Sequence, residues 1–131
     1  MRKITIVGAG RVGETTAQIL AEEELCREIA LYDVREDVPE GVALDICQTA
    51  PFFEFDCALS GSNDPQIMRG SEMLVITAGL PRKPGMSRSD VLEANVRVID
   101  EVVDQAKRYA PDAMILMVTN PVDTLTYRAF R

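Results

Sequence analysis

The chain has 131 residues, 47% of them hydrophobic, which is enough to bury one core and form one domain. No apolar run approaches the roughly 20 residues that a membrane-spanning helix requires. The formal net charge of −7 argues against partners such as nucleic acid or acidic membrane surfaces.

The cysteine and histidine content narrows the possible chemistry. Three cysteines without C-x-x-C spacing predict neither a disulfide framework nor a metal site, and they fit a reducing cytoplasm. The apolar segment that begins at residue 3 leaves no room for a preceding signal peptide, so we expect a cytoplasmic protein. Histidine is absent, and with it the commonest general acid–base at neutral pH.

Strand-like and helix-like segments alternate along the whole chain. We place strands near 3–7, 28–33, 56–60, 73–78 and 113–118, and helices near 11–25, 37–49, 64–69 and 88–109, with another starting at 122. This alternation predicts an α/β fold, a Rossmann-type doubly wound parallel sheet with strand order 3-2-1-4-5. Such folds usually have six strands, so the sixth strand and any substrate domain are expected to be absent from residues 1–131.

Residues 4–13 read ITIVGAGRVG, an apolar strand that leads into a glycine-rich turn and a helix. The glycines match the G-x-G-x-x-G pattern of dinucleotide-binding βαβ units. Gly8 would permit the tight turn, Gly10 would let a pyrophosphate approach the backbone, and Gly13 would let helix and strand pack closely. Free N–H groups at the helix start would face the phosphates. The alternative is a glycine turn in another kind of α/β sheet.

A carboxylate, Asp33, ends the second predicted strand twenty residues after Gly13. At this position it can accept hydrogen bonds from both hydroxyls of an adenine ribose, and it would repel a 2′-phosphate. The pattern therefore predicts NAD rather than NADP. Arg35 complicates this prediction because an arginine there could pair with a phosphate, although a solvated surface charge is the favoured interpretation.

Two predicted helices have clear apolar periodicity. In the helix after the glycine turn, the residues on the apolar face are Val12, Thr16, Ile19 and Leu20. In the helix over 88–109, the apolar residues recur at Leu92, Val96, Ile99, Val103 and Ala106. The pair Ala110-Pro111 ends that run.

Charged and polar residues follow the fourth and fifth strands. Residues 79–87, which we call the lid loop, contain two prolines that stiffen the segment and two glycines that supply pivots. The loop contains Arg82 and Lys83 and is followed directly by Arg88, in a chain that is otherwise acidic. A solvated surface loop is the alternative. The fifth strand ends in the segment VTNP at 118–121.

Together, the glycine turn, Asp33, the segment 78–88 and the segment 118–121 resemble the N-terminal, NAD-binding half of lactate dehydrogenase-like malate dehydrogenases. The resemblance extends from residue 4 to about residue 128. It implies that Arg82 grips the distal carboxylate of the substrate, where lactate enzymes have a neutral glutamine. It also implies that Arg88 polarises the reacting carbonyl when the lid closes.

The same resemblance implies that Asn120 hydrogen-bonds the reacting oxygen, although an asparagine before a proline can also serve a turn. Asn95 would contact the cofactor, with a solvated helix position as the alternative, and Lys83 has no matched role. The cofactor-binding residues that the resemblance implies are Gly8, Ala9, Gly10, Arg11, Val12, Gly13, Asp33, Asn95, Val118 and Asn120, and the substrate-binding residues are Arg82, Arg88 and Asn120.

The family's proton-transferring histidine, its aspartate and a further substrate-binding arginine belong to its second half. No catalytic residue and no metal site can therefore be assigned in this chain. We expect it to bind NAD(H) and to interconvert malate and oxaloacetate poorly or not at all on its own. The intact protein is expected to be a homo-oligomer, partly through the helix near 37–49.

An exposed outer edge of the fifth strand also predicts association or reduced stability of the isolated chain. Two alternatives remain at this point. One is a stand-alone NAD-sensing regulatory module, which would explain the length and the missing histidine. The other is the corresponding half of a lactate dehydrogenase, which Arg82 disfavours.

Overall fold

A computed structural model describes residues 1–131, in which strands and helices alternate. Five strands form one parallel sheet in the order β3-β2-β1-β4-β5, which confirms the predicted α/β class and strand order. The elements in chain order are β1 (Lys3–Val7), α1 (Arg11–Glu22), β2 (Glu28–Tyr32), α2 (Val38–Phe53), β3 (Ala58–Ser62), the 3₁₀ helix η1 (Pro65–Met68), β4 (Met73–Ile76), α3 (Arg88–Tyr109), β5 (Met114–Met117) and α4 (Val122–Phe130).

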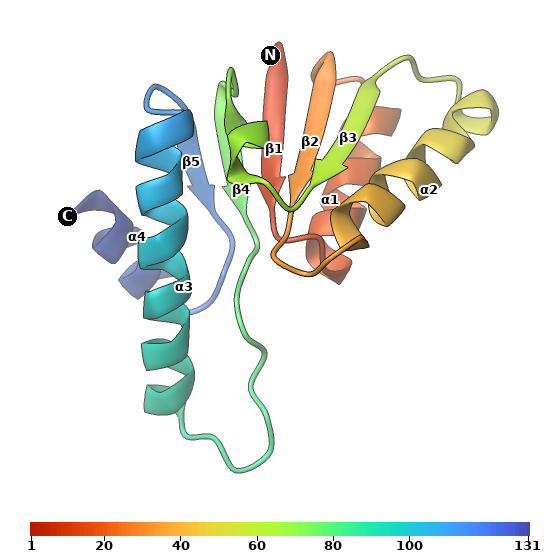
Figure 1. Cartoon of the computed structure of the whole chain (residues 1–131). Coiled ribbons are helices and arrows are strands. Elements are labelled where there is room, and N and C mark those ends of the chain that lie inside the picture. The colour runs from red at the N-terminus through yellow and green to blue at the C-terminus, as the bar shows by residue number, and fades with distance from the viewer.

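Helices cover both faces of the sheet. Helices α1 and α2 lie on one face, and α3 lies on the other with α4 beside it (Figure 1). Successive residues of a strand point to opposite faces, so one strand serves both cores. In β4, Val75 packs into the core under α1 and α2, whereas Leu74 and Ile76 pack into the core under α3.

The inward face of α1 differs from the prediction. Its buried residues are Gly13, Ala17 and Ala21, whereas Val12 and Ile19 are 57% and 52% exposed. A Cβ built on Gly13 would lie 1.8 Å from the carbonyl oxygen of Gly8, so this helix lies too close to the sheet for large side chains. Small residues recur in this helix at i, i+4 and i+8, and this spacing would have predicted the buried face correctly. Helix α3 agrees with its prediction, since Ile99, Val103 and Ala106 are buried.

The strands end together at one edge of the sheet, which we call the carboxyl edge. There the chain leaves β1 toward α1 on one face, and it leaves β4 through the lid loop toward α3 on the other face. Figure 1 shows the lid loop running out beyond the carboxyl edge before α3 begins. A reversal of this kind between two neighbouring strands is where doubly wound sheets bind ligands.

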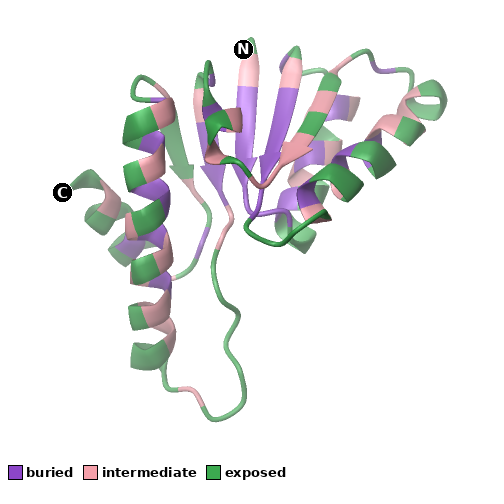
Figure 2. Cartoon of the chain, viewed as in Figure 1, coloured by how far each residue is buried: buried purple, intermediate pink, exposed green.

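The outer strand β5 is open to solvent, as predicted. Met114, Ile115 and Leu116 are 55%, 41% and 50% exposed, and the strand contrasts with the buried centre of the sheet in Figure 2. No helix combines the length and the apolar character needed to cross a membrane.

Candidate functional site

The glycine turn after β1 is as tight as its sequence predicts. Gly8 has φ +106°, and a Cβ there would lie 2.6 Å from the backbone nitrogen of Ala78. The Gly8 N–H donates to the Tyr32 carbonyl at 2.8 Å, and the Thr77 hydroxyl donates to the Gly8 carbonyl at 2.9 Å. These contacts tie the turn to β2 and β4, and the roles predicted for Gly8 and Gly13 are confirmed.

The space beside Gly10 is open. A Cβ built on this residue would meet no atom within 4 Å, in contrast to Gly8 and Gly13. Gly10 precedes the first residue of α1, and no side chain caps the helix there. The first N–H groups of α1 therefore lack a side-chain acceptor, and with the positive end of the helix dipole they suit a phosphate.

Asp33 lies just beyond β2, 9% exposed, with its carboxylate turned toward the glycine turn. Its Oδ2 accepts a hydrogen bond from the Ala9 N–H at 2.8 Å, so the two segments of the predicted dinucleotide motif are joined directly. Arg35 binds the same carboxylate with its Nε and NH2 groups at 3.0 and 2.9 Å. Burial acts to raise the Asp33 pKa, but the bonds from Arg35 and Ala9 outweigh burial and lower it.

Asn95 is 2% exposed, so the alternative of a solvated helix position is wrong. Its Oδ1 accepts from the Leu80 N–H at 2.7 Å, and its Nδ2 donates to the Asn120 carbonyl at 3.0 Å. The Thr119 hydroxyl donates to the Ala78 carbonyl at 2.7 Å. These bonds fasten the base of the lid loop to the segment after β5.

The two arginines assigned to the substrate are exposed and form no ion pair within the chain. Arg82 donates from Nε to the Met86 carbonyl at 3.0 Å, a bond inside the lid loop. Arg88 is the first residue of α3, because Ser87 and Asp90 form a capping box that starts the helix there. Arg82 and Arg88 thus lie on a segment that runs out beyond the carboxyl edge, and their unneutralised guanidinium groups can each bind a carboxylate or a carbonyl oxygen.

The remaining predicted residues also lie at this edge. Asn120 is exposed and forms a cis peptide bond with Pro121, and Val118 is 39% exposed beside it. Arg11 and Val12 are exposed on the first turn of α1. The fold therefore brings the glycine turn, Asp33, the base of the lid loop and the end of β5 to one edge of the sheet, while the rest of the lid loop extends beyond it.

Sequence analysis missed several residues that hold the site together. Thr77 and Thr119 anchor the turns after β1 and β4, and Asn63 donates from Nδ2 to the carbonyls of Asp33 and Arg35 at 2.8 and 2.6 Å. Each is a short polar residue next to a strand end, and this position is the only feature of the sequence that points to it. Its hydrogen-bond partner cannot be read from the local sequence, because the partner is 28 to 69 residues away along the chain.

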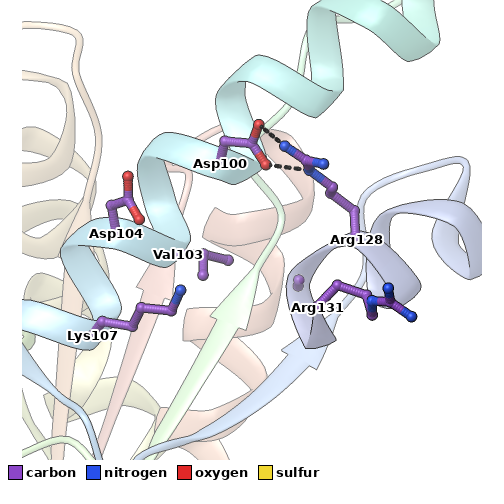
Figure 3. Close-up of a pocket in the computed structure, with 7 residues that line it drawn as sticks. Asp100, Val103, Asp104, Lys107, Arg128 and Arg131 are labelled. Carbon is purple, nitrogen blue, oxygen red and sulfur yellow. Dashed lines mark hydrogen bonds and ion pairs between the residues drawn. The ribbon is translucent and has the colours of Figure 1, made fainter.

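A hollow of about 350 Å³ lies elsewhere, between α3 and α4 (Figure 3). Arg128 crosses from α4 to bind both carboxylate oxygens of Asp100 at 2.8 Å each. None of the predicted site residues lines this hollow. A second hollow, of about 340 Å³, lies along the exposed side of α1 and is lined by Arg11, Val12, Thr15, Thr16 and Ile19.

Comparison with known proteins fits this geometry. Residues 2–131 match the family model described as lactate/malate dehydrogenase, NAD binding domain. The chain belongs to this family. It is 61% identical over 131 residues to malate dehydrogenase from Thioalkalivibrio sulfidiphilus, a match that covers all of this chain and 43% of that protein. The chain thus spans less than half the length of this relative.

Solved structures of the family superpose closely on the fold. The apo malate dehydrogenase of Picrophilus torridus gives a TM-score of 0.94 at 40% identity, covering 98% of this chain and 41% of that one. The lactate dehydrogenase of Cryptosporidium parvum, solved with lactic acid and β-nicotinamide adenine dinucleotide, gives 0.91 at 34% identity, covering 98% and 40%. The backbone alone therefore does not separate malate from lactate enzymes.

Proposed function

We propose that this chain is the NAD(H)-binding part of a malate dehydrogenase, which interconverts malate and oxaloacetate. The observation that carries the proposal is the Asp33 carboxylate, held 2.8 Å from the Ala9 N–H beside the open space at Gly10. Such an arrangement would place an acceptor for the adenine ribose next to a helix start that suits a phosphate. NAD would supply hydride acceptance and NADH hydride donation.

The chain's own residues would bind and orient the reactants. The first turn of α1 would hold the pyrophosphate, and Val118 and Asn120 would border the nicotinamide. Arg82 would bind the distal carboxylate of the dicarboxylic substrate with its planar fork. Arg88 would stabilise negative charge on the reacting oxygen, and Asn120 would donate a hydrogen bond to it. The positive charge of Arg82 favours malate over lactate as substrate.

We infer that the chain alone turns over little or no malate. It contains no histidine, and a positioned general acid or base typically accelerates a reaction by about 10²- to 10⁴-fold. A stand-alone NAD-sensing module would also be inactive, but that alternative does not account for the match to a dehydrogenase family over residues 2–131. It also leaves Arg82 and Arg88 without a role.

We further propose that the intact protein is a homo-oligomer. Apolar side chains are exposed on α1 and α2, such as Ile19 at 52% and Leu44 at 58%, and a second copy packed against these helices would cover them. The exposed residues of β5 would instead be covered by the missing half of the intact protein, so the isolated chain is expected to associate at high concentration.

The direct test is a titration of the purified chain with NADH, followed by nicotinamide fluorescence and repeated with NADPH. We expect saturable binding of NADH and weaker binding of NADPH. A chain that has a folded α/β circular dichroism spectrum but binds no NADH up to millimolar concentration would contradict the proposal.

A further inference from the structure

The peptide group that links Gly8 to Ala9 is held by a hydrogen bond at each of its two ends. Its carbonyl, that of Gly8, accepts from the Thr77 hydroxyl at 2.9 Å. Its N–H, that of Ala9, donates to the Asp33 carboxylate at 2.8 Å. Because a peptide group is planar and trans, its carbonyl and its N–H point in opposite directions and turn together. Thr77 beyond β4 and Asp33 beyond β2 therefore hold one rigid group from opposite sides.

The Thr77 hydroxyl is the one donor that the Gly8 carbonyl has within the chain. The hydroxyl also lies 3.2 Å from the Val7 carbonyl, but that carbonyl already accepts from the backbone N–H groups of Thr77 and Ala78, at 2.9 and 2.8 Å. A carbonyl oxygen has two lone pairs and a hydroxyl has one proton, so the proton belongs to the Gly8 carbonyl. Gly8 and Ala9 are both buried, so water is a poor substitute for this donor.

Gly8 does not fix the orientation of this peptide group by itself. It has φ +106°, and a glycine can leave or enter such a conformation without steric cost. The Gly8 carbonyl lies against the start of α1, since a Cβ built on Gly13 would be 1.8 Å from its oxygen and 3.0 Å from the Thr77 hydroxyl oxygen. A tilt of the peptide group would therefore displace the first turn of α1 at one end and the Asp33 carboxylate at the other.

We propose that the Thr77 hydroxyl is a positioning group for the dinucleotide. Through one peptide group it holds the Asp33 carboxylate and the first turn of α1 in the arrangement that binds the adenine ribose and the pyrophosphate. Thr77 acts through this peptide group and not by contact with the cofactor. The inference rests on the proposed function, because it requires a dinucleotide to bind at Asp33 and at the start of α1. It adds a residue of β4's end to a site otherwise built from the ends of β1 and β2.

Replacing Thr77 by valine removes the hydroxyl and keeps the size and branching of the side chain. In Thr77→Val, NADH and ADP-ribose should each bind about 5- to 20-fold more weakly. The two factors should be equal, because the two ligands share the adenine ribose and the pyrophosphate. Thr77→Ser restores the hydroxyl and should bind both ligands within about threefold of the parent chain. NADH is titrated by fluorescence and ADP-ribose by calorimetry, at one salt concentration.

Two measurements by NMR need no cofactor. In Thr77→Val, the Ala9 amide should lose about 10-fold of its protection from hydrogen exchange relative to the Ile6 amide in the middle of β1. The Asp33 carboxyl should titrate at higher pH. Burial acts to raise its pKa and bonds from Arg35 lower it, but the Ala9 N–H also lowers it, and this share is lost when the peptide group tilts. A purely structural role of Thr77 would lower stability and change neither readout.

Thr5 provides a matched control in the same sheet. It is fully buried in β1, and its hydroxyl lies 2.7 Å from the hydroxyl of Ser71. Thr5→Val makes the same change of side chain and also removes one buried hydrogen bond, but away from the carboxyl edge. It should lower the stability against urea, change neither affinity by more than about twofold, and leave the titration of Asp33 as in the parent chain.

The outcomes separate this proposal from the proposed function. If the parent chain binds NADH and Thr77→Val binds NADH and ADP-ribose equally well, the role of Thr77 is wrong and the NAD site stands. The role is also wrong if NADH binding weakens but ADP-ribose binding does not, because the effect then lies at the nicotinamide end. If the parent chain binds no NADH, both proposals fail. If Thr77→Val does not fold, Thr77→Cys serves instead, because a thiol is a much weaker donor, and the same losses are expected.

Discussion

The side-chain amide of Asn95 donates to the main-chain oxygen of Asn120 at 3.0 Å, which joins the middle of α3 to the turn after β5. The other end of the same amide accepts from the Leu80 N–H at the base of the lid loop. One buried side chain thus sets the relative positions of two segments that carry proposed substrate contacts. Asn95 is better placed to position Asn120 and the lid loop than to bind a ligand with its own amide.

Two substitutions of Asn95 can test its two hydrogen bonds separately. In Asn95→Ala, a backbone N–H and a carbonyl both lose their partner, and the free energy of unfolding should fall by about 2–4 kcal/mol. In Asn95→Asp, the acceptor for the Leu80 N–H remains, so the Leu80 amide should keep its protection from hydrogen exchange. Urea unfolding and amide exchange by NMR measure the two effects. Unprotected Leu80 in the parent chain would show that this bond does not form in solution.

The glycines of the turn should respond differently to the same added methyl group. Gly13→Ala places a Cβ 1.8 Å from a backbone oxygen, so it should lower the free energy of unfolding by about 3 kcal/mol or prevent folding. Gly10→Ala meets open space and should cost less than about 1 kcal/mol. It should nevertheless weaken NADH binding about 10-fold or more, because its Cβ lies where the pyrophosphate approaches. Equal NADH affinity in Gly10→Ala and the parent would contradict that placement.

Local sequence patterns were sufficient to predict the framework of this fold. The helix over 88–109 follows from apolar periodicity, and the strand order is the one that doubly wound dinucleotide-binding sheets have. The glycine turn and Asp33 were predictable because each is fixed by the strand that directly precedes it. Val12 and Ile19 were misassigned to an inward face, since apolar character outweighed the small residues that close packing requires.

The contacts that fasten the site could not be predicted in the same way. Asn63, Thr77 and Asn95 bind backbone groups on other elements, and nothing in the local sequence indicates those partners. The pairing of Arg35 with Asp33 was predictable only in part. The two residues are close in sequence, but only the coordinates show that the guanidinium takes both carboxylate oxygens.

The Asp33 carboxylate should contribute to stability in a pH-dependent way. Burial raises its pKa, but hydrogen bonds from Arg35 and Ala9 prevail and hold it below the ordinary value of 3.8. This contribution is therefore present at neutral pH and is lost as the pH falls below about 3.8 through the folded-state pKa. The difference in unfolding free energy between the parent chain and Asp33→Asn should narrow from pH 7 to pH 3. Other carboxylates titrate in both proteins and cancel in this comparison.

Cys26 and Cys57 should resist alkylation in the folded chain. Burial, followed by the neighbouring Cys26, raises the pKa of Cys57 to about 12, and burial also raises the pKa of Cys26. At pH 8, roughly one Cys57 thiol in ten thousand would be a thiolate, and the thiolate is the reactive form. Iodoacetamide followed by mass spectrometry should modify Cys57 slowly in the native chain and readily in urea. Rapid native labelling of Cys57 would mean that this thiol is more accessible than in the structure.

The role of Arg82 can be tested in a complete enzyme made by joining this chain to the remaining part of the Thioalkalivibrio sulfidiphilus relative. We expect this hybrid to reduce oxaloacetate with NADH, whereas the 131-residue chain alone does not. Arg82→Gln removes one charge-assisted contact worth about 1.5–3 kcal/mol, so it should shift the ratio of kcat/KM for oxaloacetate over pyruvate by about 10- to 150-fold toward pyruvate.

Lys83→Gln is the matched control for this change, because Lys83 is the adjacent exposed cation of the same loop and forms no ion pair. Lys83→Gln should change the ratio of kcat/KM for the two substrates by no more than about twofold. A solvated charge affects mainly the rate at which enzyme and charged substrate meet. If both variants lower the rate with oxaloacetate equally, the lid loop acts through its total charge and Arg82 does not grip the distal carboxylate. A large shift in Arg82→Gln alone means that one guanidinium selects the dicarboxylate.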